Sequence, residues 1–458
     1  MKRLPLSLLA HWAGGELVGD DLVIGAVAHD TRALQPGSLY VALRGERFDG
    51  HDFAYDAAMR GAGAVMVDHA VAVDVPQVVV PDTLLALARI AAGLQRDRAG
   101  KVVALTGSNG KTTVKALVVS ILQRAGHTYC NPGNRNNEIG LPMAVIDAPD
   151  DADFAVYEMG AGKPGDIAYL TDVAPPQVAL VNNVAPAHLE RMGSLMGVAE
   201  TKGAIYRALP ADGTAVINAD DAFAEYFAGL APGRRLLRFG LEASADVGAR
   251  DLRAGADGTA FVLVAPHGEA AVQLALPGRH NVLNALAAAS LALACGVSLA
   301  TIAEGLSAAQ PVAGRQVAHT LPGGAVLVDD SYNANPGSLA AAIDTLAAVG
   351  AQAGGEAWLV LGDMRELGAD AEALHADAGR RAKAAGIRRL YTLGPLSAAA
   401  AAAFGEGAHS HETHASLVAA LRADLRAGVR CLVKGSRGSA MDRVVNALLS
   451  GEDAPHVA

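Results

Sequence analysis

A short glycine-bearing stretch that ends in lysine and threonine offers the clearest chemistry in the sequence. An apolar, strand-like run at residues 102–105 precedes it, and residues 114–122, which read as a buried helix, follow it. The stretch between them, the glycine loop, comprises Thr106, Gly107, Ser108, Asn109, Gly110, Lys111, Thr112 and Thr113. A strand, a glycine turn, Gly-Lys-Thr and a helix, in that order, are typical of a loop that binds the phosphates of a nucleotide.

Each residue type in the glycine loop has its own use. Gly107 and Gly110 allow backbone dihedral angles that a Cβ would forbid, so successive amides can face one anion at the helix N-terminus. Lys111 adds a positive charge for the outer phosphates, and the hydroxyl of Thr112 or Thr113 can hold Mg²⁺. The usual pattern has a further glycine about five residues before the Gly-Lys pair, where this chain has leucine. A surface turn is the alternative, but the flanking strand and helix favour the nucleotide-binding loop.

Two further candidate side chains follow apolar strands of the same region. Glu158 comes after strand-like residues 154–157, and His188 follows strand-like residues 178–181. Ligands of open α/β sheets bind at the carboxyl ends of the strands, so both side chains are expected to face the glycine loop. A solvated glutamate and a structural histidine are the alternatives, and the shared position of the two residues favours ligands of Mg²⁺.

Asparagine side chains are concentrated at two places after the glycine loop. Residues 131–140, the asparagine loop, contain four asparagines and two glycines, which excludes a regular helix or strand. Amides both donate and accept hydrogen bonds, so Asn134 and Asn137 are candidates for orienting a substrate that carries amides and carboxylates. Asn281 and Asn284 stand at the start of an alanine-rich helix, where an amide can contact the edge of a base. A plain turn and a plain helix cap are the alternatives.

Composition restricts the class of protein and its partners. The chain has 458 residues, which predicts two to three domains at about 150 residues per domain. Its net charge of −10 argues against binding to nucleic acid or to an anionic membrane surface. Three cysteines without metal-binding spacing fit a reducing compartment, and no apolar run is long enough to span a membrane. We therefore expect a soluble cytoplasmic protein.

The alternation of strand-like and helical segments predicts an α/β fold with three domains, at residues 1–85, 86–311 and 312–458. In the small first domain, two polar clusters flank one strand-like run. Their candidate residues are Asp30, Thr31, Arg32, Arg44, Asp49 and His51. Such loops are solvated turns by default, but two of them beside one strand can also hold a phosphorylated or nucleotide ligand. The central domain contains the glycine loop, and its residues 247–276 read as antiparallel strands.

The third domain shows four strand-like runs, each followed by a polar loop and then by a helical segment. Because the carboxyl ends of parallel strands lie at one edge of a sheet, this pattern predicts a Rossmann-like domain whose loops face one ligand. Its candidate residues are Arg315, Asp330, Asn333, Lys434, Ser436 and Arg437.

Several segments, taken together and in their order, resemble the Mur ligase family. They are residues 106–113, 133–140, 158–161, 187–190, 278–281, 329–336, 362–368 and 434–437. The leucine that replaces a glycine in the usual phosphate-loop pattern also matches the family. The resemblance covers essentially the whole chain. It implies three domains that bind, in order, the UDP part of one substrate, ATP, and an incoming amine.

The resemblance implies ATP-dependent formation of an amide bond through an acyl phosphate. The expected substrates are UDP-N-acetylmuramoyl-tripeptide, D-alanyl-D-alanine and ATP, in the last cytoplasmic step of peptidoglycan precursor synthesis, and a monomer is expected. A sister ligase or a folylpolyglutamate synthetase is the nearest rival, and residues 329–336 and 362–368 favour the dipeptide-adding member. A nucleotide-driven switch is a rival of another class, but it leaves Glu158, His188 and the asparagine loop unexplained.

The resemblance also implies roles for single residues, with Lys111, Glu158, His188 and Lys202 as the catalytic set. Lys202 matches a lysine that is carbamylated by CO₂ in the family, and a carbamate can ligate Mg²⁺. Two Mg²⁺ ions are expected, one at Glu158 with Thr112 or Thr113, and one at His188 with carbamylated Lys202. The other expected contacts are Asn281 and Asn284 with adenine, Asp330 with ribose, Arg315 with the γ-phosphate, Asn134, Asn137 and Asn333 with substrate, and Lys434, Ser436 and Arg437 with the dipeptide carboxylate.

Overall fold

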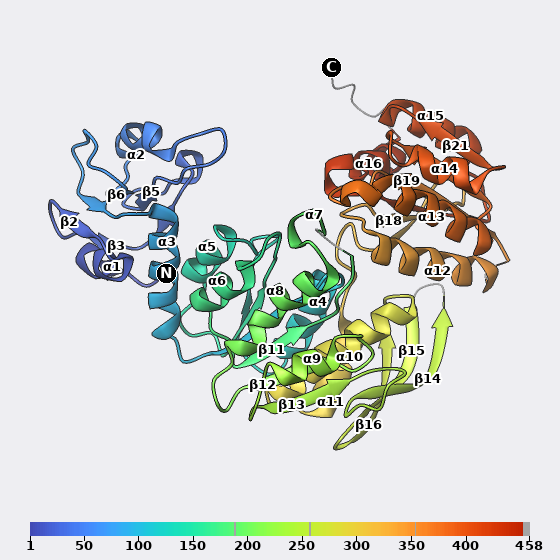
Figure 1. The fold of residues 1–458 in the computed structure, drawn as a ribbon, viewed down its shortest axis with the longest axis horizontal. Coiled ribbons are helices and arrows are strands. Elements are labelled where there is room, and N and C mark those ends of the chain that lie inside the picture. The colour runs from blue at the N-terminus through green and yellow to red at the C-terminus, as the bar shows by residue number, and fades with distance from the viewer. Residues whose placement is uncertain (187–188, 256–257, 353, 452–458) are drawn as a thin grey trace.

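The computed structural model describes residues 1–186, 189–255, 258–352 and 354–451. Figure 1 shows three parts in a row, each with its own sheet: an N-terminal part in blue, a central part from blue-green to yellow, and a C-terminal part from orange to red. This arrangement confirms the predicted α/β fold with three domains. Among the described residues, no helix combines the length and the apolar character needed to cross a membrane.

The N-terminal part is built on a five-stranded sheet in the order β2-β7-β6-β5-β4. Its strands are β2 (Glu16–Val18), β4 (Val27–Ala28), β5 (Leu39–Val41), β6 (Ala64–Val67) and β7 (Gln77–Val79), and β1 (Leu4–Pro5) pairs separately with β3 (Val23–Ile24). Its helices are α1 (Leu6–Ala13), η1 (Thr31–Ala33), η2 (Gly50–Phe53) and α2 (Ala54–Met59). Because β4 and β5 run parallel, the two polar loops that follow them lie at the same edge of the sheet.

A six-stranded parallel sheet, in the order β13-β12-β11-β8-β10-β9, forms the centre of the molecule. Its strands are β8 (Lys101–Thr106), β9 (Thr128–Cys130), β10 (Phe154–Glu158), β11 (Val178–Val181), β12 (Thr214–Asn218) and β13 (Arg235–Phe239). Its helices are α3 (Thr83–Arg96), α4 (Lys111–Leu122), α5 (Gly140–Asp147), α6 (Asp166–Val173), α7 (Leu189–Met192), α8 (Leu195–Arg207), α9 (Ala224–Gly229), α10 (Arg279–Ala294) and α11 (Leu299–Ala308).

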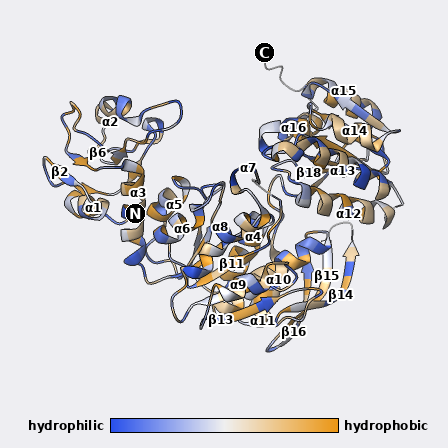
Figure 2. Ribbon diagram, viewed as in Figure 1, coloured by the Kyte–Doolittle hydropathy of each residue, from blue (hydrophilic) through white to orange (hydrophobic). Residues whose placement is uncertain are grey.

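The inner strands β8, β10 and β11 are mainly apolar and carry their polar residues at the ends, as expected for a parallel sheet covered by helices on both faces (Figure 2). Alternate residues of β8 point to opposite cores: Val102 and Ala104 pack in one, and Val103 and Leu105 in the other. A three-stranded antiparallel sheet extends this part. It comprises β14 (Gly248–Gly255), β15 (Gly258–Ala265) and β16 (Gly268–Leu274), as predicted for this segment.

The C-terminal part contains a second six-stranded sheet, in the order β17-β18-β22-β19-β20-β21, in which only β17 is antiparallel to its neighbour. Its strands are β17 (Val317–Thr320), β18 (Val326–Asp330), β19 (Glu356–Gly362), β20 (Arg389–Leu393), β21 (Ala408–His411) and β22 (Val429–Lys434). Its helices are α12 (Pro336–Gln352), η3 (Gly368–Asp370), α13 (Ala371–Ala384), α14 (Ala398–Phe404), α15 (His414–Asp424), η4 (Arg437–Ser439) and α16 (Asp442–Ser450). The loops after β18, β19 and β22 meet at one edge, as the Rossmann-like pattern predicts.

Helix α3 connects the N-terminal part to the central part. It packs against α1 on one side and against α5 on the other, so the predicted limit between residues 85 and 86 falls inside this helix. The close approach of α1 depends on Gly93, because a Cβ at this position would lie 2.4 Å from Cδ2 of Trp12. The limits of the three domains stay a proposal.

Gly93→Ala is expected to destabilise the protein although alanine favours a helix. The added methyl group must displace the Trp12 ring, and overpacking of this kind costs about 1–3 kcal/mol. Gly229→Ala in α9 is the matched control, because a Cβ there meets nothing within 4 Å. Thermal unfolding followed by circular dichroism should show a lower midpoint for Gly93→Ala only. Equal midpoints for the two variants would contradict the close packing of α1 on α3.

Candidate active site

The glycine loop joins β8 to α4 through two glycines whose backbone conformations favour this residue. Gly107 has a φ of 149° and Gly110 a φ of 79°. A Cβ on Gly110 would lie 2.5 Å from Asn284 Oδ1 and 2.6 Å from Asn182 Nδ2, so the loop has no room for a side chain there. The predicted order of strand, glycine turn and helix is therefore present, with the N-terminus of α4 directed at the loop.

Lys111 opens α4 and its side chain turns back over the glycine loop. Its Nζ donates a 2.8 Å hydrogen bond to the carbonyl of Gly107 and lies 3.5 Å from the carbonyl of Ser108. Burial lowers the pKa of the Lys111 ammonium group; nearby Arg315 lowers it further, whereas the carboxylate of Glu158 raises it. Within the described part of the chain no carboxylate forms a salt bridge with Lys111, so its charge is available to an anion.

Glu158, at the end of β10, faces a cavity of about 220 Å³ that the glycine loop also borders. Its Oε1 accepts a 2.8 Å hydrogen bond from Asn136, whereas its buried Oε2 has no hydrogen-bond partner among the described residues. Thr112 lines the same cavity, and its Oγ1 accepts a 3.2 Å hydrogen bond from Arg315. Carboxylate and hydroxyl oxygens on one cavity wall suit Mg²⁺, which prefers oxygen ligands.

The asparagine loop borders this cavity, named here the Glu158 cavity, through Asn134 and Asn136. Asn137 does not line it, because its Oδ1 accepts a hydrogen bond from the amide of Gly140 at the start of α5. Asn136, which the sequence analysis did not single out, is the side chain that holds Glu158. The path of the loop decides which of the neighbouring asparagines binds Glu158. The sequence cannot predict this choice, because the candidates are of the same residue type.

Lys202, in α8, is buried, with only 2 % of its surface exposed. No described residue forms a hydrogen bond with its ammonium group. Burial lowers the pKa of Lys202 to about 7, and the charge of Lys111 acts in the same direction. A substantial share of Lys202 is therefore the neutral amine near neutral pH. His188, the predicted partner of Lys202, lies outside the described residues.

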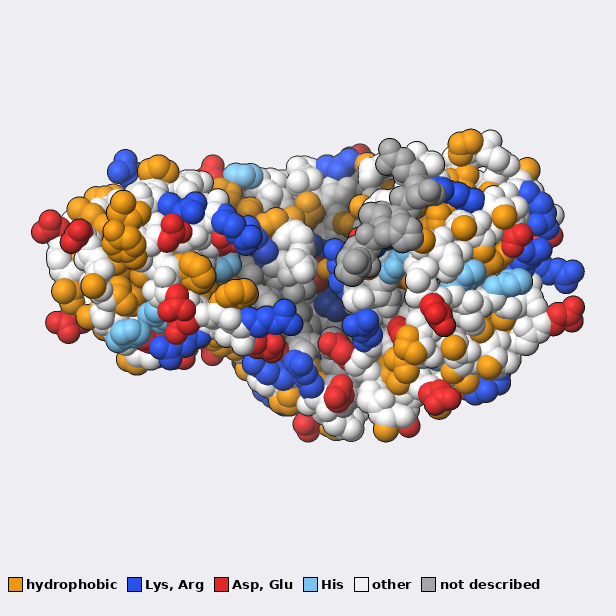
Figure 3. All heavy atoms as spheres, turned by 90° about the horizontal axis from the view of Figure 1, so that it is seen from above, with side chains coloured by type: hydrophobic (Ala, Val, Ile, Leu, Met, Phe, Trp, Pro, Cys, Tyr) orange, Lys and Arg blue, Asp and Glu red, His pale blue; other side chains and the backbone are white. Residues whose placement is uncertain are grey.

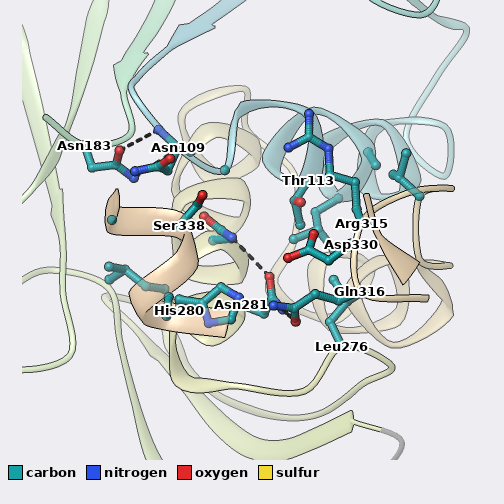
Figure 4. A pocket seen from close by; sticks show the side chains of 18 of the residues that line it. Asn109, Thr113, Asn183, Leu276, His280, Asn281, Arg315, Gln316, Asp330 and Ser338 are labelled. Carbon is teal, nitrogen blue, oxygen red and sulfur yellow. Dashed lines mark hydrogen bonds between the residues drawn. The ribbon is translucent and has the colours of Figure 1, made fainter. Parts of the chain in front are cut away.

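A second cavity, of about 230 Å³, lies between the glycine loop, α10 and the C-terminal part. Thr113, Asn281, Asn284, Arg315 and Asp330 all line it, and Figure 4 shows Asn281, Arg315, Gln316 and Asp330 around the same space. The two asparagines are mostly engaged within the protein. Asn281 donates to the carbonyl of Pro277 and accepts from Asn284, and Asn284 accepts from Asn182, at 2.8, 3.2 and 3.0 Å.

Asp330 and Lys434 form a buried pair across the neighbouring strands β18 and β22. The distance from Lys434 Nζ to Asp330 Oδ2 is 2.7 Å, and the two side chains are 4 % and 9 % exposed. Burial raises the pKa of Asp330, and the ammonium group of Lys434 works against this rise. Lys434 also donates to the carbonyl of Asn333, at 3.0 Å. Lys434 thus joins the end of β22 to the loop after β18, and both border the cavities.

A third cavity, of about 410 Å³, lies between the glycine loop and the loops after β18, β19 and β22. Of the predicted residues, Asn333, Ser436 and Arg437 line it, together with Ser108 and Lys111. The hydroxyl of Ser436 accepts from the amide of Arg365 at 2.9 Å and donates to the carbonyl of Ala334 at 3.1 Å, so it joins the three C-terminal loops.

Several residues that the sequence analysis quoted only within motifs, or not at all, also line these cavities. They are His280 and Gln316 in the second cavity, and Arg365 and Glu366 in the third cavity. Burial lowers the pKa of His280 to about 4, so its imidazole is neutral at physiological pH. Arg365 and Glu366 belong to the polar loop after β19. Their position after a predicted parallel strand could have marked them as candidate site residues.

The three cavities meet at the glycine loop. Lys111 lines both the Glu158 cavity and the third cavity, while Arg315 lines both the Glu158 cavity and the second cavity. Asn335 of the C-terminal part donates a 2.7 Å hydrogen bond to Asn109 Oδ1, across the contact between the two parts. Figure 3 shows Lys and Arg side chains around a recess in the middle of the molecule, between its N-terminal and C-terminal parts.

The predicted residues of the N-terminal part lie apart from these cavities, and their side chains pair with one another. Asp30 binds Arg32 at 2.6 Å, beside Thr31 in η1. Asp49 binds His51 at 2.5 Å and Arg44 at 3.1 Å. None of these six residues lines the three cavities. Arg32 and Arg44 are exposed and remain accessible to a ligand, whereas the side chain of His51 is buried. The two clusters lie at one edge of the sheet.

Comparison with protein-family models gives three matches in order along the chain. Residues 23–95 match the Mur ligase family, catalytic domain, residues 105–292 the Mur ligase middle domain, and residues 314–437 the Mur ligase, glutamate ligase domain. A relative from Escherichia coli (strain K12), the UDP-N-acetylmuramoyl-tripeptide–D-alanyl-D-alanine ligase, is 44 % identical over 451 residues, which are 98 % of this chain and 99 % of that protein. The chain belongs to the Mur ligase family. The predicted resemblance is thereby confirmed.

This Mur ligase also resembles solved structures over nearly its whole length. A crystal structure of MurF from Acinetobacter baumannii has a TM-score of 0.93 and 32 % identity, and covers 98 % of this chain and 99 % of that one. MurF ligase from Thermotoga maritima in complex with ADP has a TM-score of 0.84 and 28 % identity, with coverages of 93 % and 97 %. Mur ligases catalyse ATP-dependent ligation in the synthesis of peptidoglycan precursors, so the chain is a ligase that uses ATP.

Lys434→Met is expected to destabilise the C-terminal part strongly, because it leaves the carboxylate of Asp330 buried without its partner. Breaking one side of such a pair costs about 3–5 kcal/mol. Asp330→Asn combined with Lys434→Met should recover most of this loss. The measurement is urea unfolding followed by Trp358 fluorescence in a Trp12→Phe background, which removes the other of the two tryptophans. A Lys434→Met protein as stable as the parent would contradict the buried pair.

Proposed function

We propose that this Mur ligase joins D-alanyl-D-alanine to UDP-N-acetylmuramoyl-tripeptide and converts ATP to ADP and phosphate. We assign the second cavity to the nucleotide, as the nucleotide cavity, and the third cavity to the dipeptide. The meeting of these two cavities at one glycine loop carries the proposal. This arrangement lets a nucleotide and an amine approach Lys111 from different sides. The names of the relatives, and their coverage of the whole chain, support the choice of substrates. The proposal places the reaction in the cytoplasm and the enzyme as a monomer.

The chemistry begins with the repulsion between two anions, the peptide carboxylate and the γ-phosphate. Lys111 is proposed to reduce this repulsion, and Arg315, which lies over the ring of Tyr332 at 4.4 Å, is proposed to contact the same phosphate. Attack of the carboxylate gives an acyl phosphate and ADP. The dipeptide amine then attacks the acyl carbon, and phosphate leaves as the amide bond forms.

Two Mg²⁺ ions are proposed as cofactors, and the residues of the Glu158 cavity fit one of them. Oε2 of Glu158, which has no hydrogen-bond partner among the described residues, and the hydroxyl of Thr112 on the same cavity offer oxygen ligands for one. Thr113 lines the nucleotide cavity and remains the alternative hydroxyl. His188 and a carbamylated Lys202 are proposed for the other. Mg²⁺ in such sites neutralises phosphate charge and orients the transferring group.

Most of the remaining residues are assigned by the cavity or surface on which they lie, whereas Asn137 and Lys434 keep the assignment that the family resemblance implies. Asn281, Asn284 and Asp330 are proposed to contact the adenine and ribose of ATP. Asn134 and Asn137 are proposed to orient the tripeptide. The polar residues of the N-terminal part, which are Asp30, Thr31, Arg32, Arg44, Asp49 and His51, are proposed to hold the UDP part. Asn333, Lys434, Ser436 and Arg437, with the newly placed Arg365 and Glu366, are proposed to hold the dipeptide, whose two ends carry opposite charges.

Steady-state release of ADP is expected to require both UDP-N-acetylmuramoyl-tripeptide and D-alanyl-D-alanine, because the acyl phosphate forms on one and must be consumed by the other before the next turnover. A coupled ADP assay with each substrate omitted in turn measures this. L-alanyl-L-alanine in place of the D-dipeptide is the matched control. ADP release without either substrate would indicate a nucleotide-driven switch, and release with a different amine would indicate a sister ligase.

Lys202→Ala is expected to be nearly inactive while still binding nucleotide, because Lys111 and the loop backbone remain. Carbamate forms only from a neutral amine, and the lowered pKa of Lys202 makes that form available. The readouts are turnover, nucleotide affinity by calorimetry, and ¹³C NMR of the protein in ¹³CO₂-labelled bicarbonate. Exposed Lys163→Ala is the matched control. A fully active Lys202→Ala protein, or a labelled carbamate signal that persists in it, would contradict the assignment.

A further inference from the structure

A second lysine of α4, Lys115, is buried one helical turn beyond Lys111 and has no role in the proposed chemistry. Only 6 % of its surface is exposed. Residues four apart lie on the same side of a helix, so both lysines face the carboxyl edge of the sheet. A buried ammonium group is costly unless hydrogen bonds or a counter-ion compensate for its lost hydration. The partners of Lys115 therefore indicate what it does.

Lys115 has three acceptors within reach, and all belong to the site. Its Nζ donates to the carbonyl of Asn131 at 2.9 Å and to the carbonyl of Gly133 at 3.1 Å. It also lies 3.5 Å from Oε2 of Glu158, with side-chain exposures of 8 % and 4 %. This is the oxygen without a hydrogen-bond partner among the described residues. The ammonium group thus stands between the asparagine loop and the carboxylate.

The asparagine loop and Glu158 are already joined to each other by amide groups. Asn131 accepts from the amide of Glu158 at 2.9 Å and donates to its carbonyl at 3.0 Å. Asn136 donates to Glu158 Oε1 at 2.8 Å. None of these three bonds involves α4. Lys115 is the side chain that connects this unit to the helix that carries Lys111, and it brings the charge opposite to that of Glu158.

We propose that Lys115 is a positioning residue that sets the asparagine loop and the Glu158 carboxylate relative to the glycine loop. Its two hydrogen bonds hold the loop, and its charge holds Glu158 Oε2 directed toward α4. Helix α4 then fixes the position of a nucleotide bound at Lys111 relative to a substrate oriented by the asparagine loop. Asn134 and Glu158 border the same cavity as Lys111, so a shift of the loop misplaces the reacting groups.

Lys115→Met keeps an unbranched side chain of similar length and removes the charge and the donors. We expect hydrogen exchange of amides in residues 131–137 to accelerate in the ligand-free protein, while exchange in α10 stays unchanged. Turnover should fall about tenfold to a hundredfold, as expected for misplaced reacting groups, with an unchanged affinity for ATP measured without metal. Lys115→Arg keeps the charge and the donors, and should retain the slow exchange and more of the turnover.

Lys101→Met, at the far end of β8, is the matched control and should leave both measurements unchanged. In a Glu158→Gln background, Lys115→Met should add little further loss of turnover, because the two residues act together. Unchanged exchange in residues 131–137, or faster exchange throughout the protein, would overturn the proposal, as would fully additive losses. If Lys115→Met does not fold, Lys115→Arg decides by the same exchange measurement. The turnover readout rests on the proposed function, whereas the exchange readout stands if that function fails.

Discussion

Burial of positive charge beside the glycine loop is the constraint on which the rest of the site depends. Lys111 and Lys115 bring two ammonium groups to one region, close to the amine of Lys202, and Glu158 is the carboxylate that faces Lys111 and Lys115. Burial lowers the pKa of Lys111 and of Lys202; the charge of Arg315 adds to this effect at Lys111, and the charge of Lys111 adds to it at Lys202. The phosphates of a nucleotide supply the missing negative charge. Binding of nucleotide and relief of this electrostatic cost are therefore the same event.

Parallel sheets explain why the charged groups converge. The carboxyl ends of β8, β10 and β11 lie side by side in the central sheet, so the glycine loop, Glu158 and the segment after β11 share one edge. The C-terminal sheet repeats this geometry at β18 and β22, where Asp330 and Lys434 meet. The two edges face each other through Asn335 and Asn109. In the proposed reaction, the acyl phosphate made at the central edge must meet an amine held at the C-terminal edge, and two facing edges allow this.

Local patterns predicted the elements well where the signal was apolar and continuous. Strand β11 (Val178–Val181) coincides with the predicted residues, and β10 is one residue longer than predicted because Glu158 continues its pairing with β8. Strand β21 (Ala408–His411) was not predicted, since its residues are small or polar and it lies at the edge of its sheet. Helix α3 crosses the predicted domain limit because its two faces pack on different parts.

The sequence by itself determined the α/β class, the glycine loop and most strand ends that carry polar residues, because hydrophobic periodicity and glycine placement act over a few neighbouring residues. Only the tertiary structure decided which polar side chains face a cavity and which pair internally. Asn136 rather than Asn137 holds Glu158, and Lys434 pairs with Asp330 across two strands. Such pairings depend on contacts between residues far apart in the chain and on which polar groups are buried together. Neither leaves a local pattern in the sequence.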